Sequence, residues 1–252
     1  AAHLQMEKED LKTSYLDYGD CSNGYSATNG SGTAVDPYVV CTDTQFLAMT
    51  PTNFYKIGDD IFLNGAQAQV SSGQYLIHGK GHKIYGAQYA IDSTPSNSQG
   101  IFKELSLGSK IYDLTFYAPK AISSSGISMG STIEKIGILA GKNSGELIGV
   151  NLEHGLLKIP SIQGTAGTLE IGGVVGFNEG IMKNMQLDVQ MLVGDTSTPN
   201  KIKNTSVSYL DWGGVAAINS GILKQINLGG SLSLFYDNLI IASRNYVGLI
   251  VA

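Results

Sequence analysis

Ile171-Gly172-Gly173-Val174-Val175-Gly176-Phe177-Asn178-Glu179-Gly180 is the stretch that decides the fold, because the chain repeats it. Residues 136–145 and 212–221 carry the same order of glycines and apolar residues, and each copy ends in Asn-x-Gly. The first glycine recurs at intervals of 35, 41 and 35 residues, at Gly137, Gly172, Gly213 and Gly248. Self-similarity of this kind is typical of proteins built from stacked repeats.

Apolar residues recur at matching offsets after each Asn-x-Gly. The columns read Leu147, Met182, Leu223; then Val150, Met185, Ile226; then Leu152, Leu187, Leu228. The same spacing of three and then two occurs upstream at Ile111, Leu114 and Phe116, and loosely at Ile84, Ala87 and Tyr89. Polar residues alternate with these positions, which is typical of half-buried strands. We predict that equivalent strands stack in parallel, each about five to seven residues long and separated by glycine turns.

This stacking predicts an all-β fold, a single-stranded parallel β-helix (solenoid) with an N-terminal capping region. Residues 1–53 form the lead-in and cap, with a short helix over residues 43–49 that Thr42 caps. Residues 54–252 form the β-helix, and its last coil is incomplete. An uncapped coil exposes core and strand edges, so we expect its C-terminal face to be continued by further chain or covered by another subunit.

The repeat resembles the glycine-rich GLUG motif of bacterial surface and secreted proteins. Upstream segments continue the resemblance in order: 30–33, 36–38, 54–57, 60–63, 79–84 and 100–102. It covers roughly residues 30 to 252 and departs from the pattern at Ala217 and in the insert from Gly194 to Val207. It implies a right-handed parallel β-helix that is exported and adhesin-like, and it implies no substrate.

The composition excludes some partners. Glycine accounts for 32 of 252 residues, which suits a chain with many tight turns. The net charge is −5, and Arg244 is the one arginine, so no basic surface for nucleic acid is expected. No apolar run reaches the length of a membrane span, so we predict no membrane insertion. No signal peptide stands at the N-terminus, which indicates a processed chain or an excised fragment.

Cys21 and Cys41 are the two cysteines. In an exported protein they would form a disulfide, and in a cytosolic one they would be buried thiols. His78 and His82 lie four residues apart among glycines, where a strand and turn would not bring them together, and His154 is isolated. We therefore predict no metal site and no cofactor.

No catalytic constellation is expected. Glu146 and Glu179 occupy near-equivalent turns and could lie on adjacent coils, but an exposed turn offers no cleft for a hydrolytic acid pair. We interpret them as solvated turn acids. The turn asparagines, Asn143, Asn178 and Asn219, are predicted to bond coil to coil as a stabilising ladder.

Aromatic residues are the remaining candidates for binding. Tyrosine combines an apolar ring with a hydroxyl, as sugar recognition requires. The candidate binding residues are Tyr25, Tyr38, Tyr55, Tyr75, Tyr85 and Tyr89. The alternative is that these tyrosines plug the end of the solenoid and cover its core.

The sequence thus favours a non-enzymatic, adhesin-like bacterial protein, secreted or at the cell surface, that recognises a cell-surface glycan or protein. Two alternatives stay open: a carbohydrate-active lyase or hydrolase, which requires acids converging on one groove, and a structural spacer within a larger surface protein.

Overall fold

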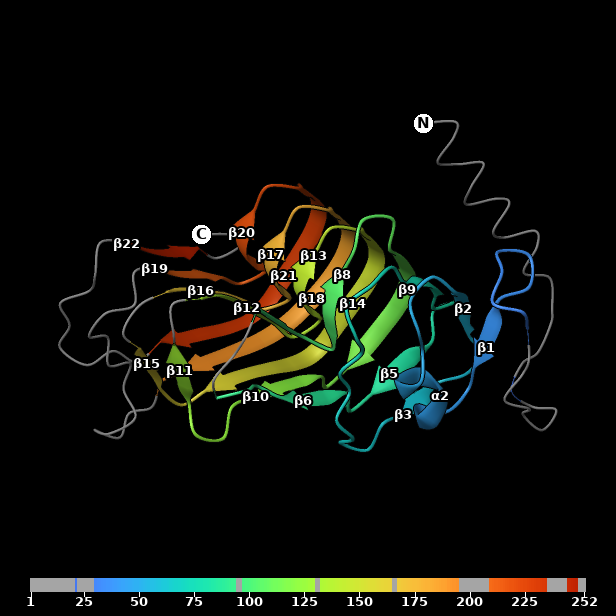
Figure 1. Ribbon diagram of the computed structural model, residues 1–252, viewed down its shortest axis with the longest axis horizontal. Helices are drawn as coiled ribbons and strands as arrows, with labels where there is room; N and C mark the ends of the chain where they lie inside the picture. Colours follow the sequence, from blue (N-terminus) through green and yellow to red (C-terminus); the bar gives the residue numbers. More distant parts are fainter. Residues whose placement is uncertain are drawn as a thin grey trace.

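The computed structural model describes residue 21 and residues 30–93, 97–129, 132–164, 167–194, 209–234 and 244–248. Within this part of the chain, every strand pair is parallel (Figure 1). Helix α2 (Asp43–Leu47) packs at the N-terminal end of the stack.

The strands form four sheets. The largest has eleven: β1 (Tyr38–Val40), β2 (Phe54–Ile57), β3 (Ile61–Phe62), β4 (Leu76–His78), β5 (Lys83–Tyr85), β6 (Gln88–Ala90), β9 (Lys110–Tyr117), β10 (Lys120–Ile122), β14 (Glu146–Ile159), β18 (Ile181–Val193) and β21 (Ile222–Leu234). A second has five: β7 (Ser98–Gln99), β12 (Ile133–Gly137), β16 (Thr168–Gly172), β19 (Tyr209–Gly213) and β22 (Arg244–Gly248). A third has four: β8 (Phe102–Leu105), β13 (Ala140–Asn143), β17 (Val175–Asn178) and β20 (Ala216–Asn219). The fourth pairs β11 (Ile127–Met129) with β15 (Ile162–Gly164).

The repeats stack in the register that the sequence predicts. Gly137, Gly172, Gly213 and Gly248 are successive register partners in β12, β16, β19 and β22. The apolar columns after the Asn-x-Gly turns also align, as in the pairing of Met182 with Leu223. The predicted parallel pairing of these repeats is therefore confirmed.

The predicted fold class, a single-stranded right-handed parallel β-helix with regular coils from residue 54, is wrong. The eleven-stranded sheet curls into half of a barrel, and the other three parallel sheets stand apart from it (Figure 1). This curled sheet also branches. The first half of β14 pairs with β9 and its second half with β10, while β9 pairs with both β4 and β5. Sequence reasoning expected stacked coils of short, separate strands.

Single left-handed residues explain the difference. They stand at matching places in the long strands, at Asp113, Gly149, Asn184 and Gln225, with φ of 49°, 65°, 56° and 56°. Such a residue bends a strand without ending it, so pairing continues on both sides of the bend and the sheet curls. The bend also explains the spacing of three and then two, because Leu147 and Val150 both point inward across Gly149.

The loose alignment at Ile84 is wrong as well. Ile77 is the register partner of Ile111, whereas Ile84 pairs with Phe116. The segment between β4 and β5, with left-handed Lys80 and Gly81, divides this repeat into two short strands that both pair with β9.

The stack begins before residue 54. Strand β1 pairs with β2, so the predicted cap already contributes to the large sheet. The predicted helix is present as α2, although it ends at Leu47 instead of Met49. Thr42 and Gln45 form a capping box, in which the Thr42 hydroxyl accepts from the Gln45 backbone and Gln45 accepts from the Thr42 backbone. The lead-in of residues 1–20 and the insert between Gly194 and Tyr209 lie outside the described residues.

The asparagine ladder is present. Asn143 Nδ2 donates to Asn178 Oδ1 at 2.8 Å, and Asn178 Nδ2 donates to Asn219 Oδ1 at 2.6 Å. The glycine of the Asn-x-Gly turn is not needed for a left-handed backbone, because Gly180 has no left-handed φ. A Cβ there would lie 2.1 Å from the Gly145 carbonyl oxygen, so glycine permits close stacking of successive turns.

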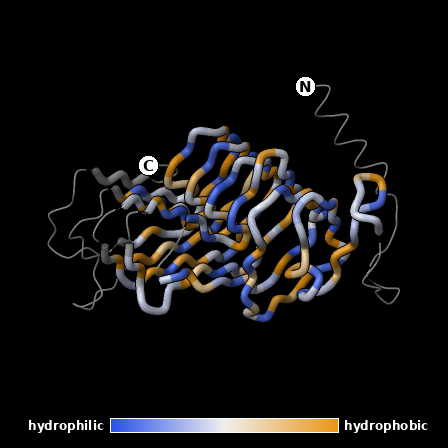
Figure 2. Tube along the Cα trace, viewed as in Figure 1, coloured by the Kyte–Doolittle hydropathy of each residue, from blue (hydrophilic) through white to orange (hydrophobic). Residues whose placement is uncertain are grey.

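One continuous apolar core fills the interior. It extends from Val40 in β1 to Ala216 in β20. Figure 2 shows the alternation of hydrophobic and hydrophilic residues along the long strands that produces it. The core is less covered in β21, where Ile226 and Leu228 are only partly buried.

Candidate functional site

Three aromatic side chains stack on the outer face of the curled sheet. Phe62 of β3, Tyr85 of β5 and Tyr117 of β9 are successive register partners. The rings of Phe62 and Tyr85 are nearly parallel, with centroids 4.5 Å apart and an interplanar angle of 7°. The centroids of Tyr85 and Tyr117 are 5.3 Å apart. These three residues point outward because their strand neighbours, such as Ile61 and Phe116, fill the core.

His154 extends this row. Its ring meets Tyr117 edge-on, with centroids 5.4 Å apart and an interplanar angle of 85°. His154 has a φ of 55° and lies where the register of β14 and β18 shifts. We call Phe62, Tyr85, Tyr117 and His154 the aromatic strip.

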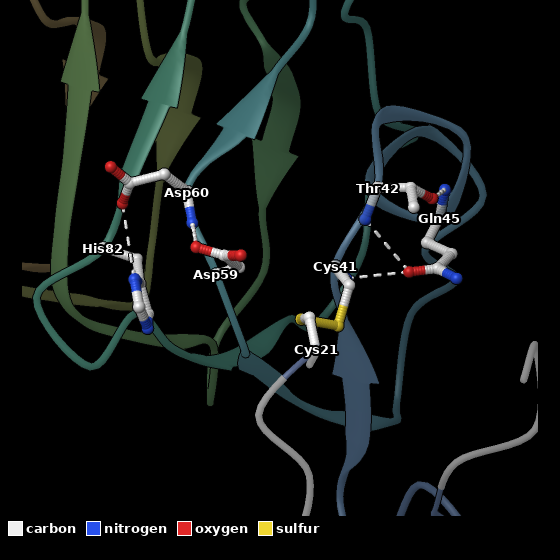
Figure 3. The surroundings of a disulfide bond; sticks show 7 residues. All are labelled: Cys21, Cys41, Thr42, Gln45, Asp59, Asp60 and His82. Carbon is white, nitrogen blue, oxygen red and sulfur yellow. Dashed lines mark hydrogen bonds and ion pairs between the residues drawn. A yellow bond between two sulfur atoms is a disulfide. The ribbon is translucent and has the colours of Figure 1, made fainter. Parts of the chain in front are cut away.

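Polar side chains line both ends of the aromatic strip. At the β3 end, Asp60 accepts from the backbone N–H of Lys83 at 2.8 Å and lies 3.3 Å from His82 Nδ1 (Figure 3). Tyr85 also donates its hydroxyl to the other Asp60 carboxylate oxygen, at 3.5 Å. At the other end, Asp188 lies 2.9 Å from His154 Nδ1.

Lys83 lies beside the middle of the aromatic strip and contacts Glu153 and Tyr117. Its ammonium group donates to Glu153 at 2.7 Å and stands 5.6 Å from the centroid of the Tyr117 ring. The hydrogen bond to Glu153 raises the pKa of Lys83, so this group is cationic at neutral pH. The strip therefore presents aromatic rings between charges of both signs.

Phe62 ends the ring stack with one face open. Its side chain is 57% exposed, and within the described residues β5 is the one strand that pairs with β3. An open ring face attracts apolar C–H groups, and the Asp60 carboxylate beside it can accept hydroxyl donors. Together they suit a ligand with one apolar face and a rim of hydroxyls.

The predicted binding tyrosines do not gather at one surface. Tyr55, Tyr75 and Tyr89 are buried in the core, and burial raises the pKa of Tyr75 and Tyr89. Tyr38 is partly buried and packs against Tyr55, with ring centroids 5.8 Å apart. Tyr85 belongs to the aromatic strip, and Tyr25 lies outside the described residues. Tyr55, Tyr75 and Tyr89 therefore fit the alternative interpretation, in which the tyrosines cover the core.

Sequence reasoning missed Phe62 and Tyr117. It favoured the tyrosines of the first ninety residues, so it passed over the phenylalanine at position 62 and the tyrosine at position 117. A local signal for Phe62 existed, since the apolar neighbours Ile61 and Leu63 alternate with it and direct it outward.

Glu146 and Glu179 make polar contacts with different residues. Glu146 accepts from the Tyr112 hydroxyl at 3.1 Å. Glu179 binds Lys142 at 2.7 Å and accepts from the Ser144 hydroxyl at 2.6 Å, and these two hydrogen bonds lower its pKa. Each acid has its own partners and stabilises the stack of turns.

Another pair of acids is close together but buried. Glu170 of β16 and Asp211 of β19 are register partners, with exposures of 5% and 8%. Burial raises the pKa of Glu170 to about 7; the Asp211 charge adds to this rise and Lys135 opposes it. A carboxyl that titrates near neutrality suits acid–base chemistry, but access to substrate is also required. Both of these side chains are more than nine-tenths buried.

Three histidines lie within 4.0 Å of aspartate carboxylates from neighbouring segments of the stack. His82 and His154 pair with Asp60 and Asp188, and His78 Nε2 lies 4.0 Å from Asp113. Within the described residues, no group of three or more His, Cys, Asp or Glu side chains could hold a metal ion.

Cys21 and Cys41 form a disulfide at the N-terminal end, with a Cα–Cα distance of 5.9 Å. Figure 3 shows it beside the capping box of α2, with Asp60 and His82, which directly precede β3 and β5, in the same view. Among the residues that the structure describes, no helix is long and apolar enough to cross a membrane.

Comparison of the chain with protein families, with curated proteins and with solved structures found no match. The resemblance to GLUG repeats therefore stays a prediction.

Proposed function

We propose that this protein recognises a carbohydrate at a cell surface through the aromatic strip. The open ring face of Phe62 beside the Asp60 carboxylate is the observation that carries the proposal. A pyranose ring has an apolar C–H face that packs on an aromatic ring, while its hydroxyls donate to a carboxylate.

The strip is held rigid by its neighbours. Phe62 is stacked on Tyr85, the Tyr85 hydroxyl is bonded to Asp60, and Asp60 is fixed by the Lys83 backbone. A preorganised surface loses little conformational entropy on binding, which favours recognition of a flexible glycan chain. The length of the strip across β3, β5, β9 and β14 suits an extended oligosaccharide.

Export is part of the proposal. The Cys21–Cys41 disulfide supports it, because disulfides form and persist mainly outside the reducing cytosol. Export and the aromatic strip together favour an adhesin-like role, because a rigid exported stack can present the strip to the surface of another cell.

A panel of immobilised glycans and cell-surface polysaccharides tests this function. We expect wild-type protein to bind a subset of the panel and to leave the bound polysaccharides at their original chain length. Shortening of a polysaccharide on incubation would favour the lyase or hydrolase alternative. Binding to no glycan would overturn the proposal.

A further inference from the structure

The Phe62 end of the aromatic strip offers polar groups as well as an open ring face. Strand β3 pairs with β5 along one edge, and the Leu63 backbone N–H donates to the Tyr85 carbonyl at 2.9 Å. Backbone groups of successive residues point to opposite edges of a strand, so the N–H and C=O of Phe62 point to the other edge. Within the described residues, no strand pairs with that edge. The open ring face looks the same way, because the other face is stacked on Tyr85.

Asp60 places a carboxylate oxygen beside this ring. It lies two residues before Phe62, about 7 Å along extended backbone, and its contact with the Tyr85 hydroxyl puts it on the same outer face. Its Oδ1 meets the Lys83 backbone N–H at 2.8 Å and His82 Nδ1 at 3.3 Å. Its Oδ2 accepts only the long 3.5 Å bond from Tyr85 among the described residues, and it points away from His82 (Figure 3). Oδ2 can therefore accept a stronger donor, and the side chain is 38% exposed.

Negative charge predominates around the open ring face. Asp59, next to Asp60, is exposed, and Glu153 lies further along the strip. Lys83 is the one lysine among these contacts, and its ammonium group donates to Glu153 at 2.7 Å. With His82 neutral, three carboxylates stand against one ammonium group. The face of an aromatic ring also carries partial negative charge, so this end of the strip attracts a cation.

We infer that this end of the aromatic strip binds an amino sugar, a pyranose that carries a protonated amine. The C–H face of the sugar packs on Phe62, the ammonium group donates to Asp60 Oδ2, and hydroxyls meet the Phe62 backbone. The inference rests on the proposed function and deepens it. The Phe62 ring holds a pyranose of any charge, and Asp60 selects the cationic one. Sugars that carry a carboxylate are disfavoured by like charge.

Three β-1,4-linked disaccharides test the inference by NMR titration. They are neutral cellobiose, its diamino counterpart made of two glucosamine units, and the anionic cellobiouronic acid. The titrations are done at low salt and slightly below neutral pH, where most sugar amines carry a proton. Choline is added as a cation without a pyranose ring.

Two variants separate the charge of Asp60 from other acids. Asp60→Asn removes the charge and keeps an oxygen for the Lys83 backbone N–H. Asp188→Asn is the matched control, because Asp188 is also paired with a histidine, His154. It lies four strands from β3, roughly 19 Å along the stack, which is beyond the reach of a disaccharide bound at Phe62. Unfolding curves verify that both variants are folded.

We expect the diamino disaccharide to bind wild type at least about fivefold more tightly than cellobiose, and cellobiouronic acid to bind more weakly than both. Asp60→Asn should reduce this preference to less than about twofold, whereas Asp188→Asn should keep it. Added salt should also reduce the preference in wild type, because the attraction is electrostatic. Choline should bind more weakly than the diamino disaccharide.

Equal affinity of wild type for cellobiose and the diamino disaccharide would overturn the inference, as would a preference that survives Asp60→Asn or high salt. Choline that binds as tightly as the diamino disaccharide would reassign the site to cations in general and also overturn it. In each case, loss of cellobiose binding in Phe62→Ala would leave the proposed function standing. Binding of none of the disaccharides would overturn the inference, and the glycan panel then decides the proposed function separately.

Discussion

Asn143 Nδ2 donates to Oδ1 of Asn178, one repeat further along the stack, at 2.8 Å, and both side chains are fully buried. Asn178 donates in turn to Asn219. Each amide also donates to the carbonyl two residues ahead, so the ladder fixes every turn and joins it to the next.

Removal of the central amide should destabilise the stack. We expect Asn178→Ala to lower the free energy of unfolding by roughly 2 to 4 kcal/mol, because the buried Asn143 and the partly buried Asn219 lose their partner. Urea unfolding followed by circular dichroism measures it. Asn227→Ala is the control, since its exposed amide makes a similar inter-strand bond to Gln186 and its loss should cost less than about 0.5 kcal/mol. Equal losses would contradict a special role for the ladder.

The bend of the long strands predicts an effect at Asn184. Its φ is 56°, a conformation that β-branched residues resist. We expect Asn184→Val to cost about 2 kcal/mol, whereas Asn184→Gly should change stability by less than about 1 kcal/mol. Lys183→Val is the matched control in extended backbone. If both valine variants were equally stable, the left-handed bend would be unnecessary.

Glu170 predicts a dependence of stability on pH. Its pKa in the folded protein is about 7, above the ordinary 4.5, so the folded state holds the proton more tightly than the unfolded chain. The free energy of unfolding should therefore fall as pH rises from about 4.5 to about 7, and then level off. Glu170→Gln removes this fall. The difference in free energy of unfolding between this variant and wild type should therefore shift in favour of the variant by on the order of 1 to 3 kcal/mol between pH 4 and pH 8.

Asp211→Asn is the companion variant for that titration. It removes a charge that raises the pKa of Glu170, so the decline in stability should end at a lower pH. Urea unfolding at several pH values measures both effects. Parallel curves for wild type and Glu170→Gln would show that Glu170 titrates normally.

The disulfide should stabilise the N-terminal end. Closing a loop across a separation of 20 residues is worth about 3 kcal/mol in the chain-entropy description. We expect the free energy of unfolding of the double variant Cys21→Ser/Cys41→Ser to be lower by about that amount and to be unchanged by a reducing agent. Wild type should fall to the same stability when reduced. No change in wild-type stability on full reduction would show that the bond adds nothing.

The repeat itself could be predicted from sequence because glycine and asparagine occupy positions that tolerate little else. Gly137, Gly172 and Gly213 align as predicted, and so do the asparagines. The curl of the large sheet could not be predicted in the same way. Its bends lie at four matching positions, which are occupied by aspartate, glycine, asparagine and glutamine. No single residue type therefore identifies these positions in the sequence.

The candidate site was harder to predict for a related reason. The rings of Phe62 and Tyr117 join one row, on either side of Tyr85, only because β3, β5 and β9 pair across loops of unequal length. Tyr75 and Tyr89 were surface candidates in the sequence, yet both rings are buried. The Tyr75 hydroxyl is hydrogen-bonded to the Ser71 hydroxyl, and the Tyr89 hydroxyl donates to the Gly137 carbonyl. Amphipathic residues suit core and surface alike, so burial decides their role.

The most direct test of carbohydrate recognition by the aromatic strip is calorimetric titration of the tightest-binding glycan from the panel. We expect Phe62→Ala to weaken binding at least about tenfold, the equivalent of about 1.4 kcal/mol, and Phe62→Leu to weaken it nearly as much because an aliphatic side chain has no ring face. Leu107→Ala, at another exposed apolar residue, should bind like wild type. Equal affinity of Phe62→Ala and Leu107→Ala would contradict recognition through the aromatic strip.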